Sequence, residues 1–354
     1  MNFLNNLINH IQKNLFQWIV AVIILGLFQV SINKGIEFTP LICLLAAFIM
    51  IYPSLVPLSF GKLKKITENY QLIFISILLN FILAPFFAWL LGYFFLKEYP
   101  VLWLGLFLIS ILPGGGMVTT WALRSKSDMP ATVSIIIFNL LLAILIVPWG
   151  LTKVIDYLNL ETVNASKQCS IETISLGVLS CGGGEINYQT VAISMLFIIV
   201  IPLILAYFTQ FFLKKNSQYS KIQNFFGKIS NLGLLIVLYF LMSLKNNAII
   251  FDSPFLITKI LFPLILFYLL NWIAIWIIHK RYFFNSKGRA LVWGSYLKYI
   301  TLALGLAISL IYQNESLSLI VIVIVLSYFI QIPTAFWLAD YWRQSNKEKH
   351  NFNL

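Results

Sequence analysis

The chain has 354 residues, of which 60% are hydrophobic and only 10% are charged, and its mean hydropathy is +0.88. Soluble domains usually carry about 25% charged residues. The composition therefore predicts an integral membrane protein and argues against a soluble enzyme, a disordered scaffold and a disulfide-rich secreted module. The net charge of +12 comes from basic residues in short loops between apolar runs, a pattern that argues against a nucleic-acid partner.

A membrane-spanning helix needs about 20 mostly apolar residues. Ten apolar runs meet or approach this length, at 16–32, 38–60, 72–97, 101–121, 130–154, 189–213, 230–244, 255–279, 289–311 and 316–338. They predict an all-α membrane protein, because a barrel would show weaker, alternating strands of about ten residues. The start of the chain is amphipathic and lacks a small-residue cleavage site, so we expect no cleavable signal peptide.

The basic residues favour one side of the predicted membrane domain. With the N-terminus placed in the cytoplasm, seventeen Lys and Arg residues fall in inside segments and five in outside segments. Lys259 and Lys298, which lie within predicted spans, complete the total of 24. Positively charged loops remain preferentially on the cytoplasmic side. The count predicts an inner-membrane protein with both termini in the cytoplasm.

A long polar loop divides the ten predicted spans into two groups of five. The predicted organisation is a cytoplasmic segment 1–15, a five-helix repeat 16–156, an extracytoplasmic loop 157–188, a second five-helix repeat 189–338 and a cytoplasmic tail 339–354. Two such repeats would have opposite topologies, as is common in transporters. Asn80 and Asn271 lie in similar Leu-Leu-Asn stretches, each in the third helix of its group, and are the signal for this inverted repeat.

Two of the three cysteines, Cys169 and Cys181, lie in the long loop. An extracytoplasmic compartment permits a disulfide between them, and the twelve-residue separation in a loop containing Gly182, Gly183 and Gly184 would close easily. Two free thiols in a flexible loop are the alternative. The spacing of the cysteines and histidines indicates no metal site, and no cofactor is expected.

Pro113-Gly114-Gly115-Gly116 interrupts the span predicted at 101–121 near its middle. Proline removes a backbone donor, and the glycines offer no side chains to support a helix. In hydrocarbon such a break is tolerated only where protein or a water-lined cavity satisfies the backbone. Because Thr119 and Thr120 follow directly, Gly114, Gly115 and the two threonines are candidate substrate or ion ligands. A proline kink with close glycine packing between helices is the alternative.

Lys298 lies about nine residues into the span predicted at 289–311. A lysine at the bilayer centre costs about 2.5–3.5 kcal/mol on insertion scales, so Lys298 is a candidate site residue, together with Thr301. Snorkelling of its ammonium to the cytoplasmic surface is the alternative, and Lys259, near a helix end, is expected to snorkel. No Asp or Glu falls in a predicted span, which argues against carboxylate-based coupling to sodium or protons.

The stretches 49–66 (IMIYPSLVPLSFGKLKKI) and 78–128 are similar to the first half of the bile acid:sodium symporter and arsenite permease superfamily, and 289–311 has a weaker similarity. Several features resemble the arsenite-permease branch: Asn80 five residues before Pro85, the turn Glu98-Tyr99-Pro100, Met117-Val118, Trp121, Asp128 and Asn139. Pro113-Gly114-Gly115 instead resembles the bile-acid-symporter branch. The resemblance implies ten helices, inverted repeats, and broken helices four and nine that cross around the substrate.

The chain departs from this pattern at the ligands of the family. The resemblance places Gly114 where the arsenite permeases carry a cysteine, so a thiolate route for arsenite is missing. The Glu and Gln of helix nine that bind sodium in the bile acid symporters correspond to Gly294 and Lys298, and their Ser-Asn pair corresponds to Val118 and Thr119. We therefore expect no sodium site of the family's kind, and the Lys298 ammonium could occupy the place of the cation.

These observations predict a secondary transporter that moves a small or amphipathic anion through the bilayer without sodium. The predicted substrate or ion site comprises Asn80, Gly114, Gly115, Thr119, Thr120, Lys298 and Thr301. Desolvation disfavours a charged lysine, so Lys298 could exchange a proton and make protons the coupling ion. A permanently charged Lys298 would give uniport or exchange instead. An arsenite or metalloid efflux permease and a non-transporting membrane sensor are the alternative functions, and no motif indicates an enzyme.

Overall fold

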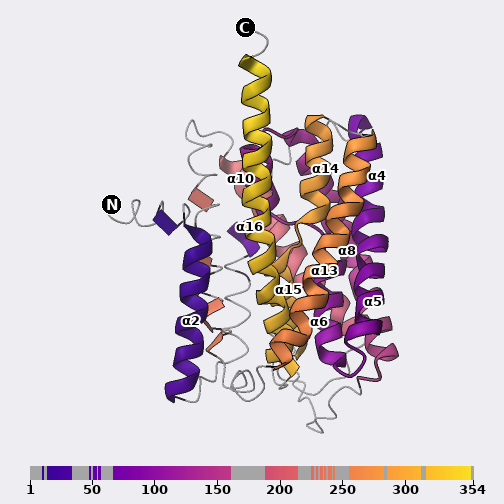
Figure 1. Cartoon of the computed structure of the whole chain (residues 1–354), viewed down its shortest axis with the longest axis vertical. Helices are drawn as coiled ribbons and strands as arrows, with labels where there is room; N and C mark the ends of the chain where they lie inside the picture. Colours follow the sequence, from indigo (N-terminus) through magenta and orange to yellow (C-terminus); the bar gives the residue numbers. More distant parts are fainter. Residues whose placement is uncertain are drawn as a thin grey trace.

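The computed structural model describes residues 14–33, 67–160, 188–213, 255–282, 285–311 and 316–351, with short pieces at 10–11 and within 48–56 and 225–243. Every regular element in this part of the chain is a helix, and most helices run side by side along the long axis of the molecule (Figure 1). The all-α prediction is confirmed. The spans predicted at 38–60 and 230–244 lie largely outside the described residues, as do Cys169 and Cys181, so the count of ten helices and the disulfide stay predictions.

The described helices follow the remaining predicted spans. They are α2 (Leu15–Asn33), the short 3-10 helix η2 (Thr67–Asn69), α4 (Tyr70–Leu78), η3 (Leu79–Leu83), α5 (Ala84–Phe95), α6 (Pro100–Ile111), α7 (Met117–Arg124), α8 (Met129–Tyr157), α9 (Tyr188–Met195), η5 (Leu196–Val200), α10 (Ile201–Leu213), α13 (Phe255–Tyr282), α14 (Ser286–Tyr296), α15 (Ile300–Ile311) and α16 (Ser316–Asn351). The last helix continues well past the predicted end at 338, so most of the predicted tail is helical.

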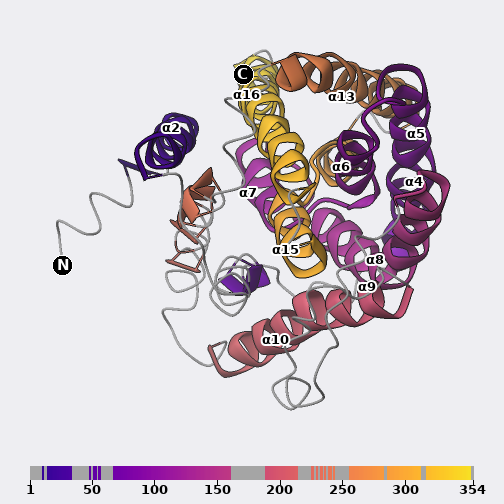
Figure 2. The ribbon, with the colours of Figure 1, turned by 90° about the horizontal axis from the view of Figure 1, so that it is seen from below.

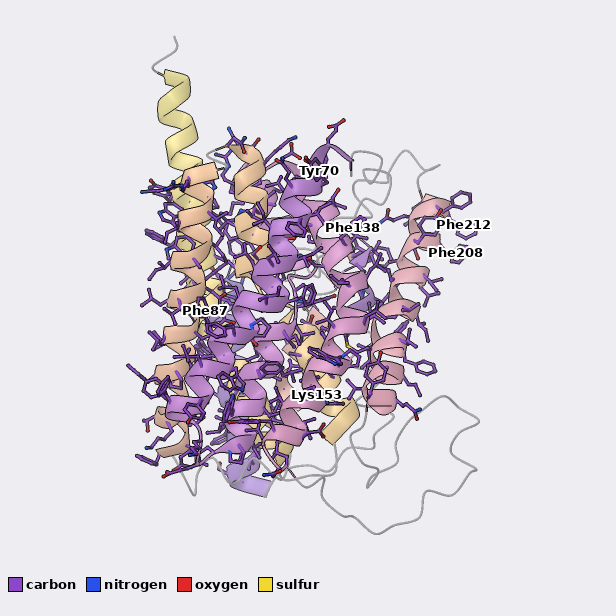
Figure 3. All side chains as sticks on the ribbon, turned by 90° about the vertical axis from the view of Figure 1, so that its right-hand side faces the viewer. Tyr70, Phe87, Phe138, Lys153, Phe208 and Phe212 are labelled. Atoms are coloured by element: carbon purple, nitrogen blue, oxygen red, sulfur yellow. The ribbon has the colours of Figure 1, made fainter. Side chains whose placement is uncertain are left out.

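Six stretches of the described residues are long and apolar enough to cross a membrane. They are Tyr70–Phe95, Met129–Tyr157, Val191–Leu213, Phe255–Arg281, Ser286–Ala307 and Leu319–Arg343. The apolar helices Gln17–Ile32 and Pro100–Ile111 are shorter. On the outer face of α10, Phe208 and Phe212 point away from the bundle (Figure 3), as expected for side chains that meet lipid rather than water.

Two of the spans contain a π-helical turn, and in both cases a proline follows it. The turn η3 begins six residues before Pro85, and η5 begins six residues before Pro202. Proline has no backbone N–H and crowds the preceding turn, so the wider π turn relieves the helix without ending it. In the first span this turn contains Asn80, which is fully buried.

Helix α6 occupies the middle of the bundle. Seen along the helix axes, it lies inside a ring formed by α13, α5, α4, α8 and α16 (Figure 2). Every residue from Leu102 to Ile111 is buried, which explains why α6 is apolar on all sides rather than along one stripe. Glycines allow the close approach of its neighbours: Gly92 on α5 faces the indole of Trp103, and Gly105 packs against Val323 on α16.

At one end of the bundle, hydrogen bonds and an ion pair connect the basic loops to neighbouring elements. The Asp128 amide donates to Ser286 O (3.0 Å), and Arg289 Nη2 donates to Lys126 O (3.0 Å). Arg124 on α7 forms an ion pair with Asp340 on α16 (2.8 Å). In Figure 3 Tyr70 and Lys153 lie toward opposite ends of the bundle. The arrangement thus gathers at one end several of the basic segments that the loop charges assign to the cytoplasm.

Replacing Gly92 with Ala is expected to destabilise the protein by about 1–3 kcal/mol, because the new methyl group would overlap the buried Trp103 indole. Unfolding of the purified protein in detergent would measure the change. Gly105→Ala is the control: its methyl group would lie 3.1 Å from Val323 Cβ and Cγ2, a tight contact but not an overlap, and a smaller loss is expected. Equal stability of Gly92→Ala and the parent would contradict this packing.

Candidate functional site

Two membrane helices are interrupted in the same way. After α6, Leu112 has extended backbone angles (φ −82°, ψ 131°), and α7 begins at Met117. After α14, Leu297 has almost the same angles (φ −76°, ψ 130°), and α15 begins at Ile300. The break predicted from Pro113-Gly114-Gly115-Gly116 is present. Lys298 lies in the second break itself, in non-helical chain directly after Leu297, and not in the interior of a helix as its sequence context suggested.

The two breaks contact each other through backbone groups. The Tyr299 amide donates to Pro113 O at 2.9 Å. A side chain on Gly114 would have its Cβ 3.0 Å from Leu297 O and 3.2 Å from Gly294 O. One on Gly115 would overlap the ring of Tyr299. The glycines are therefore required by close approach of the second break, and they bring backbone and ring atoms of both broken helices together in the middle of the bundle.

Lys298 is buried in this crossing. Its residue is 5% exposed, and its Nζ donates to Asn80 Oδ1 at 2.8 Å. The Asn80 side chain also donates from Nδ2 to Gly294 O at 3.1 Å, which fixes the orientation of its amide. The ammonium thus points into the bundle, against the snorkelling alternative. Lys259 differs: it is only partly buried, and its Nζ lies 4.9 Å from the centroid of the Phe255 ring.

Helix α16 also contacts the crossing of the two breaks, through Gln331. Gln331 Oε1 accepts a hydrogen bond from the Lys298 amide at 2.8 Å, and Gln331 Nε2 donates to the Tyr268 hydroxyl at 2.7 Å. Sequence reasoning gave Gln331 no role. The available signal was an amide inside an apolar run, two residues before Pro333, comparable to Asn80 before Pro85.

A cavity of about 30 Å³ lies beside the crossing, with room for about two water molecules. Its lining residues come from the two breaks, α7, α15 and α16: Gly115, Met117, Val118, Trp121, Leu297, Lys298, Tyr299, Ile300, Thr301, Tyr328, Gln331 and Ile332. Of the predicted site residues, Gly115, Lys298 and Thr301 line it. Asn80 contacts Lys298, and Gly114 lies at the crossing.

The two predicted threonines of α7 do not line this cavity. Met117, Val118 and Trp121 occupy the cavity side of the helix, and at 100° per residue the threonines turn to other faces. Thr119 is buried, but its hydroxyl donates to Gly116 O at 2.7 Å. Thr120 is exposed. The structure therefore separates Thr119 and Thr120 from the other predicted site residues.

The electrostatics of the crossing favour a negative ligand. Among the described residues no Asp or Glu is buried, so the Lys298 ammonium faces an amide oxygen rather than a carboxylate. In the same part of the chain, no group of three His, Cys, Asp or Glu side chains is placed to hold a metal ion. A buried ammonium without a counter-ion is unfavourable, and an anion in the cavity would relieve this cost.

Comparisons with known proteins agree on one family. The model of the Sodium Bile acid symporter family matches residues 44–251. Two arsenical-resistance proteins, both named Acr3, are similar to the chain at 23% identity. The relative from Corynebacterium glutamicum aligns over 280 residues, which is 74% of this chain and 70% of the relative. The relative from Alkaliphilus metalliredigens aligns over 381 residues, covering 98% and 95% of the two chains.

Replacing Asn80 with Asp would place a carboxylate beside the Lys298 ammonium with almost no change in shape. The resulting ion pair is expected to lower the affinity for small anions at least about tenfold, because it neutralises the charge that attracts them. Thermal stabilisation of the purified protein by added anions measures the effect.

Asn271→Asp is the matched control, since Asn271 is similarly buried but donates to Phe267 O of its own helix (3.2 Å) and does not contact Lys298 among the described residues. Wild-type anion affinity in Asn80→Asp would show that the Lys298 charge does not attract the ligand.

Proposed function

Because the chain belongs to the Sodium Bile acid symporter family, it is a secondary membrane transporter, and we propose that it moves a small or amphipathic anion without sodium. The observation that carries the proposal is the buried Lys298 at the crossing of the two broken helices. Family membership also indicates a transporter rather than an enzyme. The substrate would bind between the two breaks, at Gly114, Gly115, Lys298 and Thr301, with Asn80 holding the ammonium.

Sodium independence is supported by the groups that surround the crossing. The resemblance assigns the sodium ligands of helix nine to positions 294 and 298, which here are Gly and Lys. Gly294 O already accepts from Asn80, and the Lys298 ammonium would repel a second cation a few ångströms away. A fixed or exchangeable positive charge of the protein would therefore replace the ion that the family name implies.

In an alternating-access mechanism, the two breaks would bind the ligand and rearrange relative to each other. Helix ends at a break direct unpaired backbone groups and partial charges toward a ligand. The breaks contact each other through the hydrogen bond from the Tyr299 amide to Pro113 O and through the Tyr299 ring against Gly115. A bound anion could bridge the two breaks and stabilise one arrangement over the other. The inner membrane and cytoplasmic termini are part of the proposal, supported by the seventeen-to-five distribution of basic residues.

Uptake of anions into vesicles is expected in sodium-free buffer, and Lys298→Met should reduce it at least about tenfold by removing the attracting charge. Lys259→Met is the matched control, because Lys259 lies outside the crossing, and its uptake should stay within about twofold of wild type. A strict sodium requirement in the wild-type protein would overturn the proposal.

An imposed pH gradient in the same vesicles separates two modes of coupling. Uptake driven by the gradient and lost in Lys298→Met would indicate that Lys298 carries the coupled proton. Exchange that ignores the gradient would indicate a permanently charged Lys298.

Efflux of arsenite is the second candidate function, favoured by the names of the two similar arsenical-resistance proteins. The chain has Gly114 where the resemblance places a thiol ligand, which argues against it. We therefore expect that expression in an arsenite-sensitive bacterial strain gives no growth advantage on arsenite. Growth that depends on an intact Lys298 would reverse the order of the two candidates.

A further inference from the structure

Within the part of the chain that the structure describes, two hydroxyl groups in the wall of the cavity have no hydrogen-bond partner. Thr301 Oγ1 and Tyr328 Oη are both unpaired, and their residues are only 6% and 2% exposed. Both residues line the cavity. Buried polar groups in native proteins almost always have a partner. Two such hydroxyls on one small cavity therefore mark a place where a molecule in the cavity, either water or a solute that displaces it, completes the hydrogen bonding.

The other polar groups of the wall define what the missing partner must offer. Gln331 uses its oxygen on the Lys298 amide and its nitrogen on Tyr268. The Lys298 ammonium has three N–H donors, and one of them goes to Asn80. Lys298 lines the cavity together with Thr301 and Tyr328, so the wall offers two hydroxyl groups next to a residue that carries a positive charge.

The remaining side chains exclude other classes of ligand. Those of Met117, Val118, Leu297, Ile300 and Ile332 are apolar or offer no strong acceptor, and Gly115 has no side chain. Trp121 adds an indole N–H donor and Tyr299 a phenol hydroxyl, and neither carries a negative charge at neutral pH. A cation would meet an ammonium and no carboxylate, and an apolar group would leave both hydroxyls unpaired. An oxyanion has a negative charge and several acceptor oxygens in a small volume. The cavity, with room for about two waters, fits a carboxylate group or a small inorganic oxyanion.

We propose that this cavity binds the oxyanionic group of the transported solute, and that Tyr328 on α16 determines specificity with Thr301 by donating hydrogen bonds to its oxygens. Lys298 compensates the charge. The inference rests on the proposed function, because it specifies the anion which that site would carry. It adds α16, to which the sequence assigned no ligand, to the substrate site.

The test uses the purified full-length chain in detergent and measures binding by thermal stabilisation and calorimetry. Acetate probes the carboxylate group, phosphate probes inorganic oxyanions, and acetamide is the uncharged analogue of acetate. We expect acetate, phosphate or both to bind, and acetamide to bind at least about tenfold more weakly because it lacks the charge. Failure of both oxyanions to bind, or equal binding of acetate and acetamide, would overturn the inference.

Tyr328→Phe and Thr301→Val each remove one hydroxyl and little else. Each should weaken oxyanion binding about tenfold or more, the usual effect of losing a hydrogen bond to a charged group. The matched control is Tyr296→Phe: the Tyr296 hydroxyl bonds to Thr334 (2.9 Å), and Tyr296 is not among the residues that line the cavity. Its binding should stay within about twofold of wild type.

Stability without ligand separates a binding role from a folding role. Because the Tyr328 hydroxyl has no partner, unliganded Tyr328→Phe should be at least as stable as the wild type, even though it binds more weakly. If Tyr328→Phe and Thr301→Val bind as tightly as wild type while Lys298→Met does not, this inference fails and the proposed function stands. If Lys298→Met also binds oxyanions normally, the proposed function fails as well.

Discussion

The central constraint on this structure is that two interrupted helices must satisfy each other's backbone where lipid cannot. An unpaired amide or carbonyl in hydrocarbon costs several kcal/mol, so neither break could face the bilayer. The Tyr299 amide pairs with Pro113 O across the crossing, and the close approach leaves no space for side chains at Gly114 and Gly115. Burial of the crossing in turn requires a ring of helices around α6 (Figure 2), whose residues 102–111 are all buried.

Burial of the crossing also places the positively charged Lys298 in an apolar interior. Because Lys298 lies in the break and not in a helix, its amide is free of helical hydrogen bonding and donates to Gln331, while its side chain donates to Asn80. Asn80 can reach the ammonium because it sits in the π turn before Pro85 and is fully buried. An amide oxygen supports the ammonium but does not neutralise it, so the site keeps a net attraction for anions. A carboxylate in place of the Asn80 amide would neutralise the ammonium and abolish this attraction for anions.

The site is therefore shared among elements that are far apart in the sequence. α4 and its π turn bring the amide, the two breaks bring the glycines and the lysine, and α16 brings Gln331 and Tyr328. A polar residue in an otherwise apolar membrane helix often serves only to join helices. Lys298, Gln331 and Tyr328 line one cavity, and Asn80 reaches that cavity only through Lys298. This convergence of polar groups is the basis on which we propose a binding site rather than helix packing alone.

The sequence by itself determined the membrane class, the helical fold and the break at Pro113, because hydropathy and helix-breaking residues act locally. It also singled out Lys298 as an anomalous charge in an apolar run, and the structure buries that residue. It also indicated Asn80 through the family resemblance, Gly115 through the helix break, and Thr301 through its position close to Lys298. It could not decide which faces of α7 and α16 turn inward. Thr119 and Thr120 follow the glycines directly yet turn away, whereas Gln331 and Tyr328, more than 200 residues later, line the cavity. Only packing sets the rotation of a helix that is apolar on nearly every side, so the tertiary structure alone decided those members of the site.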